Sequence, residues 1–423
     1  MTTALIIFIL MYAGMLAFSK WRVWFALGGA ACMLLFGVLP VSRLLPSVNW
    51  NVIMMISGTM GIVSLFIDSG MPALMADVML KHLPNAMTAI IALSAFSGIV
   101  SAFVDNVATV LMVAPVGLAI CRKLDINPVP AIIAIAVSSN LQGAATLVGD
   151  TTSILLGDYA GMSFTDFLFW HGRFSIFWAV ELGALATIPI LYFLFRRDRQ
   201  PISIDETTVV TNHVPTVILI AVVLSLILAS FFTIPAVDGI KNGLICMAWF
   251  VIGIVSDCLR KRDLSPLRLV LREMDYTTLA MLVGLFIVIA GVKSAGIIDE
   301  VAEWFSHIGS GNVFLLYTLI VFISVILSAF IDNIPYVAAM LPVVQALAYK
   351  LGTDPVLLYF GLLSGATLGG NITPFGASAN VAAIGILRRN GYAVGNRDFF
   401  RIGIPFTLAA VLVGYAFIWF VWA

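Results

Sequence analysis

Two stretches of this chain, residues 101–156 and 328–383, are copies of each other. They align without a gap at an offset of 227 residues, and 17 of the 56 aligned positions are identical. Each copy places an Asp-Asn pair, at 105–106 or 332–333, inside an otherwise apolar run. Lipid does not tolerate such groups unless they face protein or water. A duplicated polar interruption of hydrophobic segments indicates a binding site at the interface between two repeats of a membrane transporter.

The composition of the chain is that of a membrane protein. It is 61% hydrophobic and 10% charged, with a mean hydropathy of +1.08, whereas soluble domains carry about 25% charged residues. Lipid requires every backbone polar group to be satisfied internally. We therefore expect an all-α polytopic membrane protein in contact with the lipid bilayer. The net charge of zero gives no reason to expect a nucleic-acid partner.

Hydrophobic runs predict about ten membrane crossings, the first of which is expected to be a retained helix and not a signal peptide. Two further runs, 86–121 and 312–349, are long enough to enter the membrane and return, so we expect both to be re-entrant hairpins. Short amphipathic helices are expected at 72–83 and 297–308. The expected crossings lie near 3–18, 24–40, 51–67, 129–160 (interrupted), 174–195, 214–232, 240–256, 276–292, 355–387 (interrupted) and 403–422.

The distribution of Lys and Arg supports this layout. If the loop holding Lys20 and Arg22 is cytoplasmic, 17 basic residues fall inside and 5 outside, as the positive-inside rule requires. Both termini are then outside, and the second copy enters the membrane from the side opposite to the first, as in an inverted-topology repeat. The predicted organisation is N-terminal scaffold helices at 1–45, a first repeat at 46–195, a cytoplasmic linker at 196–213, central helices at 214–272 and a second, inverted repeat at 273–423.

Each copy supplies two polar parts that we expect to meet in a binding site at the midplane. One part is the hairpin tip, and the other is a helix broken by Gly and Pro, at 140–153 and at 367–380. Such a break frees backbone N–H and C=O groups, and the helix ends add partial charges, so the site can hold an ion or a small polar solute. The candidate binding residues are Asp105, Asn106, Thr109, Asn140, Thr146, Asp150, Thr151, Asp332, Asn333, Thr367, Asn371, Thr373, Ser378 and Asn380.

Three of these residues, Asp105, Asp150 and Asp332, are candidates for carrying a coupling proton. A carboxylate at the bilayer centre costs roughly 3 kcal/mol or more. It is stable only when it is protonated, paired with a cation or facing water, and these are also the states of proton or cation coupling. The alternative is that each Asp caps the N-terminus of a half-helix and never changes its charge.

Other chemistries lack their required residues. The chain contains no HExxH, no GxSxG and no Walker loop, which argues against an intramembrane hydrolase and an ATP-driven pump. The four cysteines are scattered singly and form no metal-ligand spacing. We therefore expect no enzyme, no metal site and no organic cofactor, with a proton, or alternatively Na⁺, as the coupling ion.

At these motifs the chain resembles the ion transporter superfamily, and within it the group of arsenite permeases, NhaD-type sodium–proton antiporters and the pink-eyed dilution (P) protein. The resemblance implies a secondary transporter with a scaffold region and a moving transport region, located in a bacterial or archaeal plasma membrane. It also implies two kinds of partner, a second copy in a homodimer and, for an arsenite pump, a cytoplasmic ATPase subunit. The motifs that carry it are SAFVDN (101–106), GAATLVGD (143–150), SAFIDNIP (328–335) and GASANV (376–381).

One departure within the superfamily bears on coupling. The more distant sodium–dicarboxylate symporters carry Ser-Asn-Thr at each hairpin tip, whereas this chain has Asp-Asn-Val at 105–107 and Asp-Asn-Ile at 332–334. The tips thus have their own carboxylates, which favours coupling to protons over sodium–dicarboxylate symport.

The substrate remains open between several classes. Uncharged arsenite needs hydrogen-bond donors and acceptors, which Asn, Thr and Asp provide, while Na⁺ needs the same oxygen atoms as ligands. No arginine accompanies the motifs along the sequence, so a multiply charged oxyanion such as citrate is disfavoured. We expect proton-coupled efflux of a small inorganic solute of the arsenite or antimonite type. The alternatives are Na⁺/H⁺ antiport and, further, an anion channel or carboxylate permease.

Overall fold

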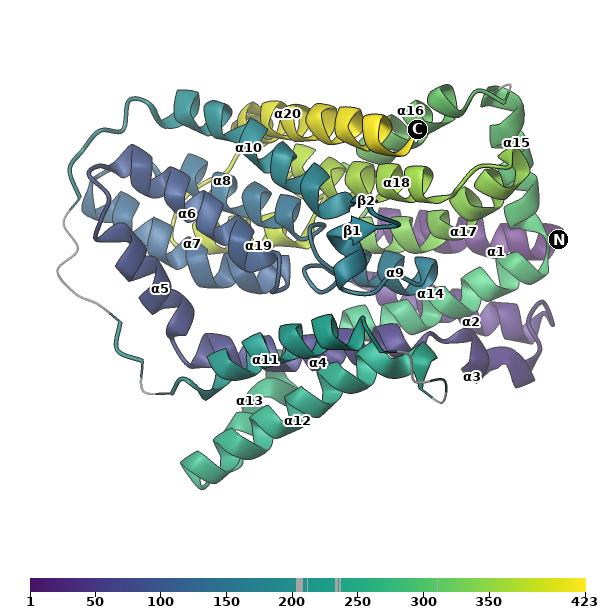
Figure 1. The fold of residues 1–423 in the computed structure, drawn as a ribbon, viewed down its shortest axis with the longest axis horizontal. Helices are drawn as coiled ribbons and strands as arrows, with labels where there is room; N and C mark the ends of the chain where they lie inside the picture. Colours follow the sequence, from purple (N-terminus) through teal and green to yellow (C-terminus); the bar gives the residue numbers. More distant parts are fainter. Residues whose placement is uncertain (203–207, 211, 233–234, 236, 310) are drawn as a thin grey trace.

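The computed structural model of the chain describes residues 1–202, 208–210, 212–232, 235, 237–309 and 311–423. Twenty α-helices make up most of these residues (Figure 1). The first half contains α1 (Thr2–Ala17), α2 (Arg22–Leu35), α3 (Leu44–Ser47), α4 (Trp50–Asp68), α5 (Met71–Leu80), α6 (Ala86–Ser101), α7 (Asn106–Lys123), α8 (Pro128–Gln142), α9 (Thr151–Ala160) and α10 (Ile176–Phe195). The second half contains α11 (Val214–Ala229), α12 (Lys241–Lys261), α13 (Ser265–Glu273), α14 (Tyr276–Ser294), α15 (Ile297–Gly309), α16 (Val313–Ser328), α17 (Asn333–Leu351), α18 (Val356–Gly369), α19 (Ser378–Arg389) and α20 (Asn396–Trp422).

The two halves repeat the same order of helices. Helices α4 to α9 correspond to α14 to α19, and the caps that start them correspond as well. Asn49 caps α4 and Asp275 caps α14, and the hairpin helices α7 and α17 begin at Asp105 and Asp332. An Asn or Asp side chain at this position accepts hydrogen bonds from the free N–H groups of the first turn. The duplication seen in the sequence therefore includes the residues that start the helices.

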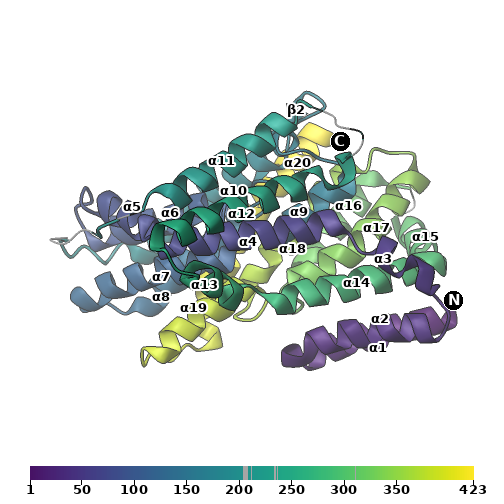
Figure 2. The same cartoon turned by 90° about the horizontal axis from the view of Figure 1, so that it is seen from below.

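The second helix of each half packs against the other half. Helix α2 lies along α14, and α12 lies along α4. Both crossings depend on a glycine, because a methyl group added at Gly284 or Gly58 would lie within 3 Å of the backbone of the partner helix. The two halves are therefore intertwined and do not form separate units. Figure 2 shows α1 and α2 as a pair at one edge of the molecule, next to α14.

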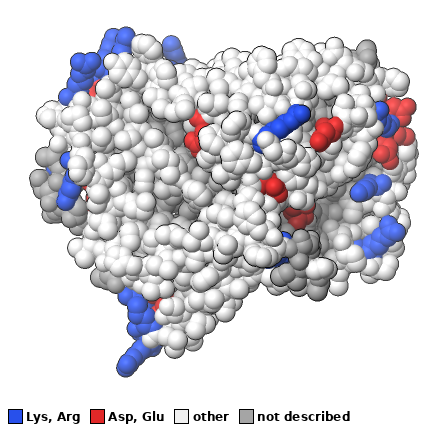
Figure 3. All heavy atoms as spheres, in the orientation of Figure 1, with Lys and Arg blue, Asp and Glu red and all other residues white. Residues whose placement is uncertain are grey.

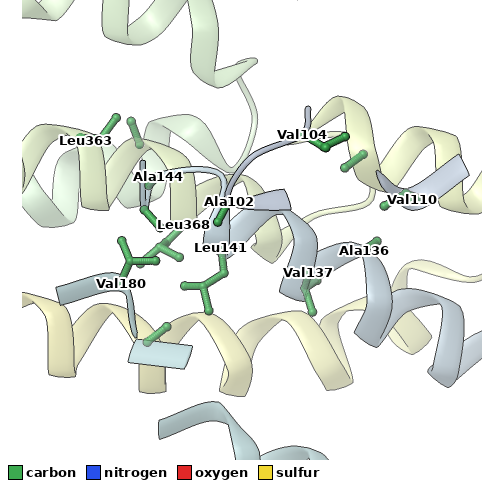
Figure 4. Packing of buried hydrophobic residues seen from close by; sticks show 14 of the residues in the cluster. Ala102, Val104, Val110, Ala136, Val137, Leu141, Ala144, Val180, Leu363 and Leu368 are labelled. Atoms are coloured by element: carbon green, nitrogen blue, oxygen red, sulfur yellow. The ribbon is translucent and has the colours of Figure 1, made fainter. Parts of the chain in front are cut away.

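The repeated hairpins occupy different ends of the molecule. Helices α6, α7 and α8 lie toward the left of Figure 1, and α16, α17 and α18 lie toward the right. The breaks between α8 and α9 and between α18 and α19 fall between these groups. Figure 4 shows small and branched side chains filling this centre, among them Ala102 and Val104 from the first hairpin and Leu141, Ala144 and Leu368 from the two breaks.

Several local features differ from the sequence-based expectation. The chain is not entirely α-helical, because Phe169–Trp170 (β1) and Arg173–Phe174 (β2) form a two-stranded antiparallel sheet. Their turn has positive φ at both His171 and Gly172, as a two-residue hairpin requires. The amphipathic helix α13 was not expected, and α20 begins at Asn396 instead of near residue 403.

The predicted linker at 196–213 lies partly outside the described residues. Its described parts are not free in solvent, because Gln200 and Asp198 accept hydrogen bonds from the first N–H groups of α6, at 2.9 and 2.7 Å. Thr208 donates both its N–H and its hydroxyl to Asp77 on α5. These described parts of the linker are therefore attached to α5 and α6 of the first repeat.

Among the described residues, seven helices are long and apolar enough to cross a membrane by length and composition: α4, α7, α10, α12, α14, α17 and α20. Two of these, α7 and α17, belong to the segments that we expected to be re-entrant. Eight further helices are apolar but shorter.

Candidate functional site

Both hairpins turn at their Asp-Asn pair. The Asp105 carboxylate accepts hydrogen bonds from the N–H groups of Val107 (3.0 Å) and Ala108 (3.2 Å). Asp332 accepts a longer one, 3.4 Å, from the N–H of Ile334. Each Asp is therefore a helix cap, as the alternative reading of the sequence expects. Capping occupies one carboxylate oxygen in each case and leaves the other available for a further partner.

Each broken helix is attached to the tip of its own hairpin. The hydroxyl of Thr146 donates to the carbonyl of Ala102, and that of Thr373 donates to the carbonyl of Ala329. Within each helix break, a side chain from the far side also bonds to a carbonyl on the near side. In the first copy, Ser153 Oγ donates to the Gly143 carbonyl (3.0 Å). Asn380 Nδ2, at the matching position, donates to the Gly370 carbonyl (2.9 Å) and the Thr373 carbonyl (3.1 Å). These bonds hold tip and break together as one unit in each copy.

A buried amide network joins the two copies. Asn106 Nδ2 donates to Asn140 Oδ1 (2.8 Å), and Asn140 Nδ2 donates to Asn371 Oδ1 (3.0 Å) and to the Thr367 carbonyl (2.8 Å). Asn371 Nδ2 in turn donates to the carbonyl of Val137 (3.0 Å). Asn140, Asn371 and the Thr367 side chain are completely buried. Because their donors are used within the protein, these residues fix the two breaks against each other in this conformation.

Asp150 lies where the two copies meet. It is 4% exposed and caps α9, with Oδ1 accepting from the Thr151 N–H (2.8 Å). Its Oδ2 accepts from the Thr152 hydroxyl (2.8 Å) and from Nδ2 of Asn333 (3.2 Å), which belongs to the other hairpin tip. Neutral donors stabilise this carboxylate, and no ion pair of Asp150 occurs among the described residues. The group is positioned to exchange a proton or to bind a cation.

A cavity of about 370 Å³ opens beside these groups. Four carboxyl groups line it: Asp105, Asp150, Glu273 and Asp275. None of its described lining residues is Lys or Arg, although the Arg22 guanidinium lies near the Asp275 carboxyl. The remaining lining residues are Met60, Val63, Ser64, Ile67, Asn106, Val107, Ala108, Leu111, Thr151, Thr278, Asn333, Ile334 and Ser378. The cavity thus offers an excess of hydrogen-bond acceptors and negative charge, which favours a cation or a solute rich in donors over a free anion.

The structure divides the fourteen predicted site residues into two groups. Six line the cavity: Asp105, Asn106, Asp150, Thr151, Asn333 and Ser378. The other eight lie outside its lining: Thr109, Asn140, Thr146, Asp332, Thr367, Asn371, Thr373 and Asn380. Most of these eight form the hydrogen bonds that hold each helix break to its hairpin tip or join the two breaks. Thr109 donates a long hydrogen bond to the carbonyl of Val104 (3.4 Å).

Sequence reasoning missed four polar residues of the cavity: Ser64, Glu273, Asp275 and Thr278. The Ser64 hydroxyl donates to Glu273, which ends the unexpected helix α13. Burial alone would raise the pKa of Asp275, but hydrogen bonds from Thr277 and Thr278 and the nearby Arg22 guanidinium hold this pKa below its ordinary value. The signal in the sequence was two acids flanking a long apolar run.

The environment of Asp332 corrects one expectation. Arg22, at the start of α2, forms an ion pair with the Asp332 carboxylate, and Ser378 Oγ lies 3.4 Å from the same oxygen. We predicted that no arginine accompanies the motifs. This is true of neighbouring positions in the sequence but wrong for the folded protein, where Arg22 contacts Asp332. The two tips differ in this conformation: Asp105 faces the cavity, whereas Asp332 is paired with a cation from a different helix.

These features are those of a polytopic, helical membrane protein built from two related halves. Residues 4–362 match the family described as "Citrate transporter" (CitMHS), and the chain belongs to this family. It is 31% identical over 430 residues to the "46 kDa membrane protein" of Mycobacterium leprae, covering 98% of this chain and 97% of that protein. It is 30% identical over 405 residues to a Mycobacterium tuberculosis protein called an uncharacterized transporter, covering 93% and 92%.

One relative and one solved structure show more distant similarity. The human P protein is 26% identical over 406 residues, which cover 78% of this chain but 48% of the P protein. The fold is similar to that of the YdaH transporter of Alcanivorax borkumensis, with a TM-score of 0.62, 14% identity, and coverage of 90% and 89%. Membership of the arsenite permease or NhaD-type group in particular is not shown by these similarities.

Proposed function

We propose that this protein is a secondary active transporter that couples proton movement to the export of a small inorganic solute of the arsenite type. The observation that carries the proposal is the cavity at the junction of the two copies, whose described lining holds four carboxyl groups and no Lys or Arg. A transporter needs a site whose charge can change when solute leaves. Buried carboxyl groups held only by neutral donors meet that need.

The topology that we propose has ten crossings, two re-entrant hairpins, inverted repeats and both termini outside a bacterial plasma membrane. It is supported by the placement of α6–α8 and α16–α18 toward different ends of the molecule (Figure 1). In Figure 3, Lys and Arg gather at the left and lower-left edges, whereas they alternate with Asp and Glu at the right edge. A cysteine at position 265 should accordingly react with an impermeant thiol reagent only from the cytoplasm. Labelling from outside sealed cells would contradict this topology; position 205, an equivalent site in the linker, lies outside the described residues.

Asp105 and Asp150 are the proposed proton carriers, because both line the cavity and neither has an ion pair among the described residues. Asp332 has a different proposed role in this conformation. With Arg22 bound to it, its charge is compensated, so it exchanges a proton only after the ion pair opens. Alternation between two conformations then changes which tip is free.

The proposed substrate follows from the donors and acceptors in the cavity. Arsenite is an uncharged trihydroxide at neutral pH and has three O–H donors for the carboxylate and amide oxygens. Na⁺ would use the same oxygens as ligands, so Na⁺/H⁺ antiport is the second candidate, and the excess of carboxylates favours it specifically. The family description suggests a carboxylate such as citrate, but four acids without a lining cation would repel a free tricarboxylate.

One experiment separates these candidates. Purified protein is reconstituted in liposomes with an imposed pH gradient, and internal arsenite, Na⁺ and citrate are measured together with proton flux. We expect arsenite accumulation linked to proton movement, and its loss in both Asp105→Asn and Asp150→Asn. Sodium-dependent proton flux without arsenite uptake would establish the antiporter instead. Citrate uptake that is insensitive to the pH gradient would overturn both candidates.

A further inference from the structure

Helix α10 carries a carboxyl group that the cavity does not use. Glu181 is the sixth residue of Ile176–Phe195 and the only charged residue in this otherwise apolar helix. It is partly exposed and does not line the cavity. An ionisable side chain inside an apolar segment is costly unless it has a partner or a function.

No charged group of the neighbouring helices faces Glu181. Helices α6 and α8, which pack on α10, contain no Asp, Glu, Lys, Arg or His. In α20 the charged residues are Arg397, Asp398 and Arg401, and Tyr415 Oη hydrogen-bonds to the Thr318 hydroxyl (2.8 Å).

The charged residues of α20 are far from Glu181 along the helix axis, because of where α10 packs against α20. Gly183 lies against Ala410, and Gly414 lies against Ala179. Glu181 is therefore level with residues 410–414. Arg401 precedes Ala410 by nine residues, which is about 13 Å along the helix. A cation from α20 does not compensate Glu181.

The partner of Glu181 is an amide with an unsatisfied atom. Gln142 is 5% exposed, and its Nε2 donates to Glu181 Oε2 at 3.2 Å. The Gln142 Oε1, on the same planar amide, is buried without a hydrogen-bond partner. A carboxylate can only accept hydrogen bonds, so it cannot satisfy Oε1, whereas a protonated carboxyl donates one hydrogen bond and accepts another. A neutral acid can therefore accept from Nε2 with one oxygen and donate to Oε1 with the other, whereas a carboxylate leaves this buried acceptor unpaired, which is costly.

We propose that Glu181 and Gln142 form a proton-binding site outside the solute cavity, in which Glu181 is held as the neutral acid and donates its proton toward Gln142 Oε1. One proton is taken up, one O–H bond forms, and no other bond changes.

The position of Gln142 connects this site to the cavity. Gln142 is the last residue of α8, directly before Gly143, and a methyl group added at Gly143 would lie 2.9 Å from Asp150 Cβ. When Glu181 releases its proton, the hydrogen bond to Gln142 Oε1 is lost. Gln142 stands at the start of the helix interruption that carries Asp150, so the loss acts on this segment. The effect on transport rests on the proposed function, whereas the proton site itself does not.

The proton site is tested with dicyclohexylcarbodiimide, which reacts with protonated carboxyl groups in apolar surroundings. Purified protein is treated at neutral pH and the adducts are located by mass spectrometry. The control carboxyl is Glu303, which is exposed and paired with Lys350 at 3.1 Å. We expect the adduct on Glu181 to exceed that on Glu303 severalfold, because the reagent reacts with the neutral acid and Lys350 holds Glu303 in its ionised form. Equal or lower reaction at Glu181 would overturn the proposal.

Infrared spectroscopy supplies a second, independent readout. The Glu181→Gln variant keeps a donor and an acceptor facing Gln142 and should fold normally. Its difference spectrum against the parent should lose one protonated-carboxyl C=O band, and an unchanged band pattern would overturn the proposal. In liposomes the same variant should alter the pH dependence of transport and leave solute binding intact. If no solute is transported at all, the proposed function fails, while the labelling and the infrared band still decide the proton site.

Discussion

Alanine at Gly149 should separate the hairpin tip from the broken helix. A methyl group at this position would lie 2.7 Å from the Gly143 carbonyl oxygen and 2.9 Å from those of Ala102 and Ser101. These oxygens would have to retreat by 0.5 to 0.7 Å to reach the 3.4 Å of an ordinary contact. All three belong to the backbone, so no flexible side chain can yield. Overpacking of this kind typically costs about 1–3 kcal/mol.

The expected loss of transport is larger than the loss of stability. The displaced segments carry Asp105, Asn106 and Asp150, and a misplacement of about 1 Å can cost on the order of a hundredfold in rate. We expect Gly149→Ala to lower transport at least tenfold in liposomes and to lower the denaturation temperature in detergent. Gly376→Ala should behave in the same way, because its surroundings in the second copy match.

The matched control is Gly385→Ala in α19. Its nearest neighbour would be the end of the Arg389 side chain at 3.9 Å, so the substitution should be neutral or stabilise the helix by up to about 1 kcal/mol. Transport and thermal stability of Gly149→Ala equal to those of this control would refute the reasoning about the junction between tip and break.

Three further predictions concern charged and buried polar groups. Arg22→Met should destabilise the protein by about 1–2 kcal/mol, which is less than for a fully buried pair because Arg22 is 29% exposed. Adding Asp332→Asn should recover part of this loss. A double-mutant cycle in thermal denaturation measures both effects. Asn140→Leu should cost about 1–3 kcal/mol, because it leaves buried groups of the amide network unsatisfied; unchanged denaturation would contradict this. The stability contributed by the lowered pKa of Asp275 is present above the ordinary carboxyl value of about 3.9 and is lost as the pH falls through the folded value; Thr278→Val removes one donor and should move this acid limb to higher pH.

The sequence carries enough information for the class of the protein and for the parts of the candidate site, because both depend on local composition. Acid–amide pairs at 105–106 and 332–333 could be recognised as helix interruptions, since lipid exposure would make them costly. The membrane transporter class is confirmed by the family match. The helix breaks near 143–150 and 373–377 follow from Gly and Pro, which local rules describe well.

The partners of these residues could not be predicted in the same way. Arg22 and Asp332 are 310 positions apart, and their pairing depends on α2 lying along α14, which no periodicity reveals. Asn140 and Asn371 have the same residue types as a binding site, but they bond to each other across the two copies. Glu273 and Asp275 lie at a helix boundary, where a charged residue is ordinary unless the tertiary fold turns it toward a cavity.

The exchange of helices between the halves bears on how the protein is made. A ribosome delivers α2 to the membrane long before α14, the helix whose backbone approaches it through Gly284. Until then the face of α2 at Ala26 lacks its partner helix, and Arg22 has no Asp332 beside it. Helix α4 must likewise wait for α12. The contacts between the halves are therefore completed only after α12, α14 and the start of α17 have been inserted.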